Sequence, residues 1–112
     1  MPDSAALLPT PDQSVLFAKF FQGLAHSVRL RIVMLLVDGE KNVGELTRLL
    51  GLSQAHVSNH LACLKWCGFV ATRQEGRNVY YAVADPRIRQ IVSLGQAVVV
   101  ENAARIAACR RM

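Results

Sequence analysis

The segment of residues 42–68 reads NVGELTRLLGLSQAHVSNHLACLKWCG, and its pattern decides the fold. A short helix is predicted over Val43–Leu50, because Gly51 favours the left-handed conformation in which many helices end. Ser53 is a favoured N-cap residue and predicts a second helix from Gln54 to about Cys67. Two helices joined by so short a turn have the length and the turn chemistry of a helix-turn-helix.

The segment after these two helices changes from a helical to a strand pattern. Phe69–Arg73 and Asn78–Val83 are rich in β-branched and aromatic residues, and they flank Gln74–Arg77, which predicts a β-hairpin. A basic hairpin directly after a helix-turn-helix is a wing. The sequence therefore predicts a mainly helical fold with a β-hairpin wing, the winged helix-turn-helix.

Three more helices are predicted outside this unit. Caps and apolar spacing favour helices from Asp12 or Ser14 to about Leu24, from Ser27 to Asp38-Gly39, and from Asp85-Pro86 to about Ala108. Residues 1–11 hold three prolines and show no periodicity, so we expect a flexible N-terminal arm there. One domain is expected over residues 12–112.

The last predicted helix has a broad apolar face, formed by Ile88, Ile91, Val92, Leu94, Val98, Val99 and Val100. A domain of 112 residues has little other surface with which to cover so long an apolar helix. We therefore expect the helix to bury part of this face against a second copy of the chain.

The composition favours an anionic partner. The net charge is +5 and the pI is about 9.6, which suits nucleic acid. No apolar run approaches the roughly 20 residues that span a bilayer, and no signal-peptide pattern opens the chain. We expect a cytoplasmic protein without a membrane partner. No nucleophile–base pair stands out, so neither an enzyme nor a small-molecule substrate is expected.

The second helix of the helix-turn-helix has two distinct faces. At about 100° per residue, Val57, Leu61 and Leu64 face the core, and small or amide side chains lie opposite. Such side chains can approach base edges, and no acidic residue occurs from Leu46 to Gln74, whereas a merely solvated face would carry Lys and Glu. The residues expected at bases are Gln54, Ala55, Ser58 and Asn59. Those expected at phosphates are Lys65, Arg73 and Arg77, and the two arginines could instead enter the minor groove.

Cys63, Cys67 and Cys109 are the three cysteines, and an odd number in a cytosolic chain argues against a disulfide framework. Cys63 and Cys67 are one helical turn apart, with Cβ atoms about 5–6 Å apart, which is wide for a disulfide but suits a bound metal ion. Three thiolates favour Cd(II), Pb(II) or Cu(I), and Zn(II) would want a fourth ligand such as His60. Two alternatives are open. One is a winged-helix module for protein contacts, in which the cysteines are inert core fillers. The other is a redox or persulfide switch in which Cys109 bonds to Cys63 or Cys67.

Three stretches together resemble the ArsR/SmtB family of winged-helix metal-sensing repressors. They are GLAHSVRLRI at residues 23–32, LSQAHVSNHL at residues 52–61 and EGRNVYY at residues 75–81, within a match over about residues 15–100. The chain departs from the family at His26-Ser27, where Asp-Pro is usual. The resemblance implies a homodimer packed through its first and last helices. It also implies that the homodimer binds a palindromic operator and leaves it when metal binds.

The chain keeps the metal ligands known in the family only in part. The cysteine pair of the arsenic- and cadmium-sensing branches is absent from Val43–Leu50. Asp85 and Glu101 could match the carboxylates of the zinc site, but its histidines are replaced by Arg87 and Val98. The remaining set, Cys63, Cys67 and Cys109, resembles the cadmium- and lead-sensing CmtR-type branch. The resemblance thus implies a repressor released by Cd(II) or Pb(II), with Zn(II) and Cu(I) as alternatives.

Overall fold

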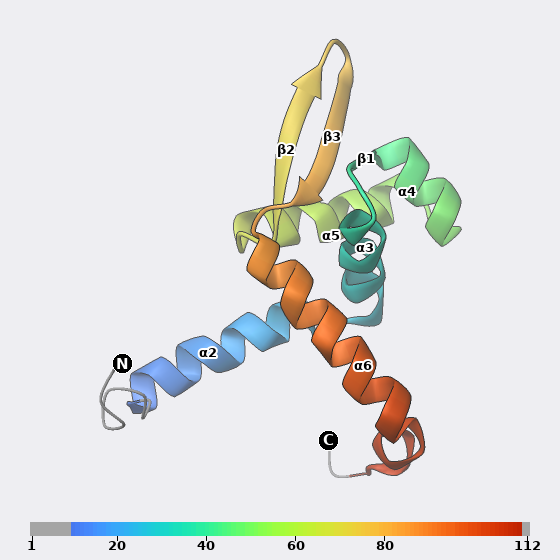
Figure 1. The fold of residues 1–112 in the computed structure, drawn as a ribbon. Helices are drawn as coiled ribbons and strands as arrows, with labels where there is room; N and C mark the ends of the chain where they lie inside the picture. Colours follow the sequence, from blue (N-terminus) through green and yellow to red (C-terminus); the bar gives the residue numbers. More distant parts are fainter. Residues whose placement is uncertain (1–9, 111–112) are drawn as a thin grey trace.

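The computed structural model describes residues 10–110 of the chain. Its elements, in order, are α2 (Pro11–Leu24), α3 (Ser27–Val37), β1 (Lys41–Asn42), α4 (Val43–Leu50), α5 (Gln54–Trp66), β2 (Val70–Glu75), β3 (Asn78–Val83) and α6 (Pro86–Ala108). The predicted fold class, mainly helical with a hairpin wing after a helix-turn-helix, is confirmed (Figure 1).

Apolar residues at helical spacing build one core beneath the hairpin. The side chains that are least exposed come from α3, α4 and α5, and they are Ile32, Val33, Leu36, Leu46, Val57, Leu61 and Leu64. The three residues of α5 predicted to face the core are therefore confirmed in that position. Burying such side chains stabilises the fold by about 1.5–3 kcal/mol each, which holds α5 firmly against α3.

Gly51 and Ser53 end and cap the two helices as predicted, and the structure adds a cap at the start of the first helix. Asn42 and Glu45 form a capping box at the start of α4, and Gly51 ends that helix at a φ of 67°. The Ser53 hydroxyl accepts a hydrogen bond from the His56 backbone N–H at the start of α5. These caps satisfy backbone groups that neither helix could satisfy alone, and so they fix the turn.

The predicted caps of the two preceding helices are wrong. The cap of α2 is Thr10, not Asp12 or Ser14, because Gln13 completes a capping box with it and Pro11 suits the first helical position. Helix α3 is capped by His26, whose Nδ1 accepts from the Val28 N–H. Residues 10 and 11 of the predicted arm therefore belong to the start of α2, and the rest of that prediction lies outside the described part of the chain.

The wing is longer and its turn tighter than predicted. Strands β2 and β3 pair in register from Val70–Val83 to Glu75–Asn78, so the turn is Gly76-Arg77 and not Gln74–Arg77. Gly76 has a φ of 60°, which an L side chain rarely adopts. Strand β1 was not predicted; it pairs with β3 and gives the antiparallel sheet order β1-β3-β2.

Helices α2 and α6 extend away from this core and diverge from one another (Figure 1). Their exposed apolar residues include Leu16, Phe17 and Phe21 on α2, and Leu94, Val98, Val99 and Val100 on α6. Helix α6 is long and apolar enough to cross a membrane by length and composition alone. Its uncharged run covers only residues 90–100, about half of what a bilayer requires.

Candidate functional site

The outer face of α5 carries the small and amide side chains that were predicted to read bases. Gln54, Ala55 and Asn59 are exposed, and Ser58 is half-buried at the edge of this face. The opposite face of the helix is locked into the core by Val57. Helix α5 therefore presents these four side chains on a rigid support, as a recognition helix requires.

The tip of the wing lies close to the start of the helix-turn-helix. A shallow, open groove is lined by the beginnings of α4 and α5 and by the wing, namely by Asn42, Val43, Gly44, Gln54, Arg77, Asn78 and Val79. Arg77 is exposed and forms no ion pair within residues 10–110. Its guanidinium is thus available to an anion that lies along this groove.

Arg73 has a different environment from Arg77. It lies opposite Tyr80 within the strands, not at the tip, and its guanidinium carbon is 4.9 Å from the Tyr80 ring centroid. Its Nη2 and Nη1 atoms form ion pairs with Glu40 and Glu75. The hydrogen bonds to these two carboxylates raise the pKa of Arg73, and the bond from Arg73 lowers the pKa of Glu40. The Arg73 charge is therefore already compensated.

Two of the three cysteines come together at the end of α5. Helix α5 ends at Trp66 and Cys67 is its C-cap, but the Cys67 N–H still donates to the Cys63 carbonyl oxygen at 3.0 Å. The two residues therefore remain one helical turn apart. Partial burial raises the pKa of the Cys67 thiol, and the neighbouring Cys63 thiol raises it further, whereas Arg29 opposes the rise.

Cys109 lies elsewhere in the subunit. It caps the far end of α6, beyond a kink at Asn102, and Figure 1 shows that end well separated from α5. Within residues 10–110, no group of three or more His, Cys, Asp or Glu side chains is arranged to hold a metal ion. One subunit thus brings together Cys63 and Cys67, and it does not add Cys109 to them.

A cationic side chain that sequence reasoning missed contacts Cys63. Arg29 of α3 donates from Nη1 to the Cys63 Sγ at 3.2 Å and from Nη2 to the Gln22 carbonyl oxygen at 3.4 Å. A signal for it was present in the sequence. Arg29 precedes the core residues Ile32 and Val33 by three and four positions, so a charge stands on the apolar stripe of its helix.

Three imidazoles line the same side of α5. The His60 ring centroid is 4.5 Å from that of His26 and 5.1 Å from that of His56. Burial lowers the pKa of His60, and the charges of His26, His56 and Arg29 lower it further. His60, which the sequence suggested as a possible fourth ligand for Zn(II), thus packs against two other imidazoles.

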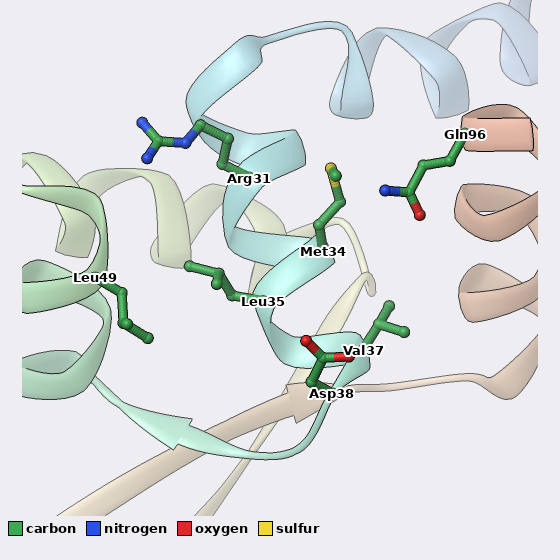
Figure 2. Close-up of a pocket in the computed structure, with 7 residues that line it drawn as sticks. All are labelled: Arg31, Met34, Leu35, Val37, Asp38, Leu49 and Gln96. Carbon is green, nitrogen blue, oxygen red and sulfur yellow. The ribbon is translucent and has the colours of Figure 1, made fainter. Parts of the chain in front are cut away.

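A second concavity lies on another side of α3 and holds no thiol. It has a volume of about 340 Å³ and is lined by Arg31, Met34, Leu35, Val37, Asp38, Leu49 and Gln96. Figure 2 shows Gln96 of α6 facing Met34 across this space, with Leu49 of α4 on the other side. Its lining combines apolar side chains with two charges at the rim, and it is separate from the cysteines.

Residues 26–72 match the model of the bacterial regulatory proteins of the arsR family. The probable mercury resistance operon repressor of Streptomyces lividans is 38% identical over 95 residues, which cover 85% of this chain and 76% of that protein. The HTH-type transcriptional regulator CmtR of Mycobacterium tuberculosis is 43% identical over 83 residues, or 74% of this chain and 69% of that one.

A solved structure supports the same assignment. The homodimeric winged helix-turn-helix DNA-binding domain of Mb0332 from Mycobacterium bovis, a possible ArsR-family regulator, has a TM-score of 0.76 and 29% identity. The alignment covers 86% of this chain and 92% of that one. The fold, the order of its elements and these sequence matches agree, and the chain belongs to the ArsR family of DNA-binding transcriptional regulators, which are not enzymes.

Proposed function

We propose that this chain is a metal-responsive transcriptional repressor. In this proposal it binds operator DNA as a homodimer in the cytoplasm and leaves the operator when a thiophilic ion binds cysteine sulfur. The observation that carries the proposal is the pairing of Cys63 and Cys67 one turn apart at the end of the helix that presents the candidate base-reading face. The name of one relative, the probable mercury resistance operon repressor of Streptomyces lividans, supports a metal effector.

The DNA interface follows from the two faces of α5 and from the wing. Asn and Gln side chains can form two hydrogen bonds with adenine, and a serine hydroxyl can bond several bases. We assign base contacts to Gln54, Ala55, Ser58 and Asn59. We assign phosphate contacts to Arg77 and Lys65, which are exposed and form no ion pair within the described chain. Arg73 could reach a phosphate only by exchanging its carboxylate partners for it.

Exposed apolar surface supports a homodimer. Phe17 and Phe21 on α2 are 59% and 48% exposed, and Val99 and Val100 on α6 are 48% and 81% exposed. Helix faces of this kind are normally buried in soluble proteins, and contiguous exposed apolar patches mark interaction sites. A second copy is the occupant that the homodimeric domain of Mb0332 favours.

The cysteine sulfurs of one subunit form part of a binding site for a soft metal ion. Two thiolate sulfurs from one helix favour thiophilic ions, so Cd(II) and Pb(II) are the proposed effectors and Zn(II) and Cu(I) are alternatives. Cys109 of the same chain lies at the far end of α6. We therefore propose that the third sulfur is Cys109 of the second subunit. The ion would supply a strong bond between the recognition helix and the dimer interface.

This connection gives a physical route to release from DNA. A dimer must present its two recognition helices about 34 Å apart, one DNA turn, to fill both half-sites. A bond from α5 to the α6 of the other subunit would fix the orientation of α5 relative to the dimer axis. A coupling of about 1–3 kcal/mol per linked event is typical and would suffice to empty an operator.

The test is a titration of reduced protein with Cd(II), Pb(II), Zn(II) and Cu(I), with thiolate-to-metal absorbance and operator binding recorded together. Cys63→Ser and Cys67→Ser should keep DNA binding and lose both tight metal binding and metal-induced release. Cys109→Ser should keep weaker metal binding and lose most of the release. If Cys109→Ser responds to metal as the wild type does, Cys109 is not a ligand and this mechanism is wrong.

One observation favours a thiol redox switch as a second candidate. Arg29 donates a hydrogen bond to the Cys63 sulfur, and a neighbouring cation is typical of reactive cysteines. In that case an oxidant, not a metal, would release the operator by linking Cys63 or Cys67 of one subunit to Cys109 of the second subunit. Mass spectrometry of the protein with and without reductant, beside the metal titration, distinguishes the two candidates.

A further inference from the structure

Arg29 occupies an unusual position for a charged residue. It is half-buried on the core stripe of α3, and its Nε is buried without a hydrogen-bond partner among the described residues. None of the ion pairs formed within residues 10–110 includes it. Burying a cation without a compensating anion is costly. An anion that is present in only one state of the protein would therefore stabilise this half-buried cation in that state.

The two hydrogen bonds of Arg29 connect two parts of the fold. Nη1 donates to the Cys63 Sγ on α5 at 3.2 Å, and Nη2 donates to the Gln22 carbonyl oxygen in the last turn of α2 at 3.4 Å. The same carbonyl accepts the N–H of Ala25, the C-cap of α2. One guanidinium therefore bridges the cysteine pair and the end of a helix that carries exposed aromatic side chains.

The two contacts differ in how they respond to charge on sulfur. A hydrogen bond from a guanidinium to a thiolate is roughly twice as strong as one between neutral groups. The contact to Gln22 is already near the upper limit of hydrogen-bond length. When Cys63 binds a metal ion, its coordinated sulfur is the stronger acceptor of the two, so the guanidinium is drawn toward it and the weaker contact to α2 is lost.

From this geometry we propose that Arg29 is the positioning residue that transmits effector binding at Cys63 and Cys67 to helix α2, and through α2 to the dimer and the operator. The inference rests on the proposed function, because it requires a metal-bound thiolate at Cys63. In the metal-free protein Arg29 holds the end of α2 in place. In the metal-bound protein Arg29 supports the thiolate and releases that end.

The test uses the full chain with Arg29→Met, which keeps an unbranched stem but removes the charged guanidinium, and Arg29→Lys, which keeps the charge but removes the planar fork. Arg31→Met is the matched control, since Arg31 is an exposed arginine two residues further along α3. Operator affinity is measured with and without Cd(II), and Cd(II) affinity with and without operator. The factor by which Cd(II) changes operator affinity must equal the factor by which the operator changes Cd(II) affinity, because coupling between two ligands is reciprocal.

In the wild type and in Arg31→Met, Cd(II) should weaken operator binding by about tenfold or more. Arg29→Met should still bind Cd(II), about tenfold more weakly, as is typical when a residue behind a metal ligand is lost. Saturating Cd(II) should change the operator affinity of Arg29→Met by less than about twofold relative to the metal-free variant. In Arg29→Lys, the Cd(II)-induced change in operator affinity should lie between those of the wild type and Arg29→Met. This variant provides the test if Arg29→Met does not fold.

A second readout does not depend on DNA. Amide hydrogen exchange of Ala25 should be faster in metal-free Arg29→Met than in the wild type, because α2 has lost its contact with Arg29. Cd(II) should speed this exchange in the wild type and leave it unchanged in Arg29→Met. Full Cd(II)-induced release in Arg29→Met would overturn the inference and leave the proposed function intact. A wild type that binds no Cd(II) at Cys63 and Cys67 would overturn the proposed function itself.

Discussion

The imidazole of His60 on α5 lies 4.5 Å, centroid to centroid, from the imidazole of His26 at the N-cap of α3. Both rings belong to a cluster with His56 and Arg29 that contains no carboxylate partner among the described residues. Burial first, and then these neighbouring charges, lower the pKa of His60 below its usual value of 6.5. The native state therefore resists protonation at this site more than the unfolded state does.

The first prediction is that stability falls with pH below 6.5 in a way that depends on His60. As the pH falls through 6.5, the unfolded chain takes up a proton at His60 before the native protein does, so the free energy of unfolding decreases. The decrease ends once the pH is below the native pKa. The free energy of unfolding, measured with denaturant between pH 5 and 7.5, should depend less on pH in His60→Gln than in the wild type. Equal pH dependence in both proteins would contradict this reading of the cluster.

The second prediction separates the two arginines of the wing. Arg77→Ala should weaken binding to all DNA sequences alike and reduce the slope of log K against log salt by about one, because one phosphate contact is lost. Arg73→Ala should change the slope much less, because Glu40 and Glu75 already compensate the Arg73 charge. Fluorescence anisotropy over a series of salt concentrations measures both slopes. A slope loss in Arg73→Ala as large as in Arg77→Ala would show that Arg73 exchanges its carboxylates for phosphate.

The third prediction concerns the bases that α5 reads. Asn59→Ala and Gln54→Ala should relax sequence preference by about 1–3 kcal/mol at the affected base pair, because each removes an amide able to form two hydrogen bonds with adenine. Gln96→Ala, an amide loss on α6, is the control and should leave the preference unchanged. Competition between operator and random DNA measures the effect. Losses of equal size on both DNAs would argue against base reading.

The fourth prediction is that α6 carries much of a dimer interface. Val99 is 48% exposed in a single chain, so a charge there should be tolerated by the subunit but not by an apolar interface. Val99→Glu should give monomers or aggregates in sedimentation velocity at micromolar concentration. Gln90→Glu adds the same charge at an exposed position nearer the start of α6 and should stay dimeric. A stable wild-type monomer at that concentration would rule out the interface.

Local patterns were enough to predict most of the fold. The helix-turn-helix follows from the caps at Asn42 and Ser53 and from the left-handed Gly51, because each acts on backbone groups within a few residues. Strand β1 could not be predicted in this way, since two residues carry no period. Lys41 and Asn42 are a strand only because they pair with Tyr81 and Tyr80 of β3.

Part of the candidate site follows from the sequence, and the rest depends on the tertiary structure. The sequence alone determined that Cys63 and Cys67 lie one turn apart, and that Arg29 shares a helix face with core residues, because helical periodicity fixes which residues share a face. Only the tertiary structure decided that the Arg29 guanidinium meets the Cys63 sulfur, 34 residues away in sequence, and that Cys109 lies far from both. Periodicity defines the faces of a helix, but the packing of α3 on α5 and the divergence of α6 decide which faces meet.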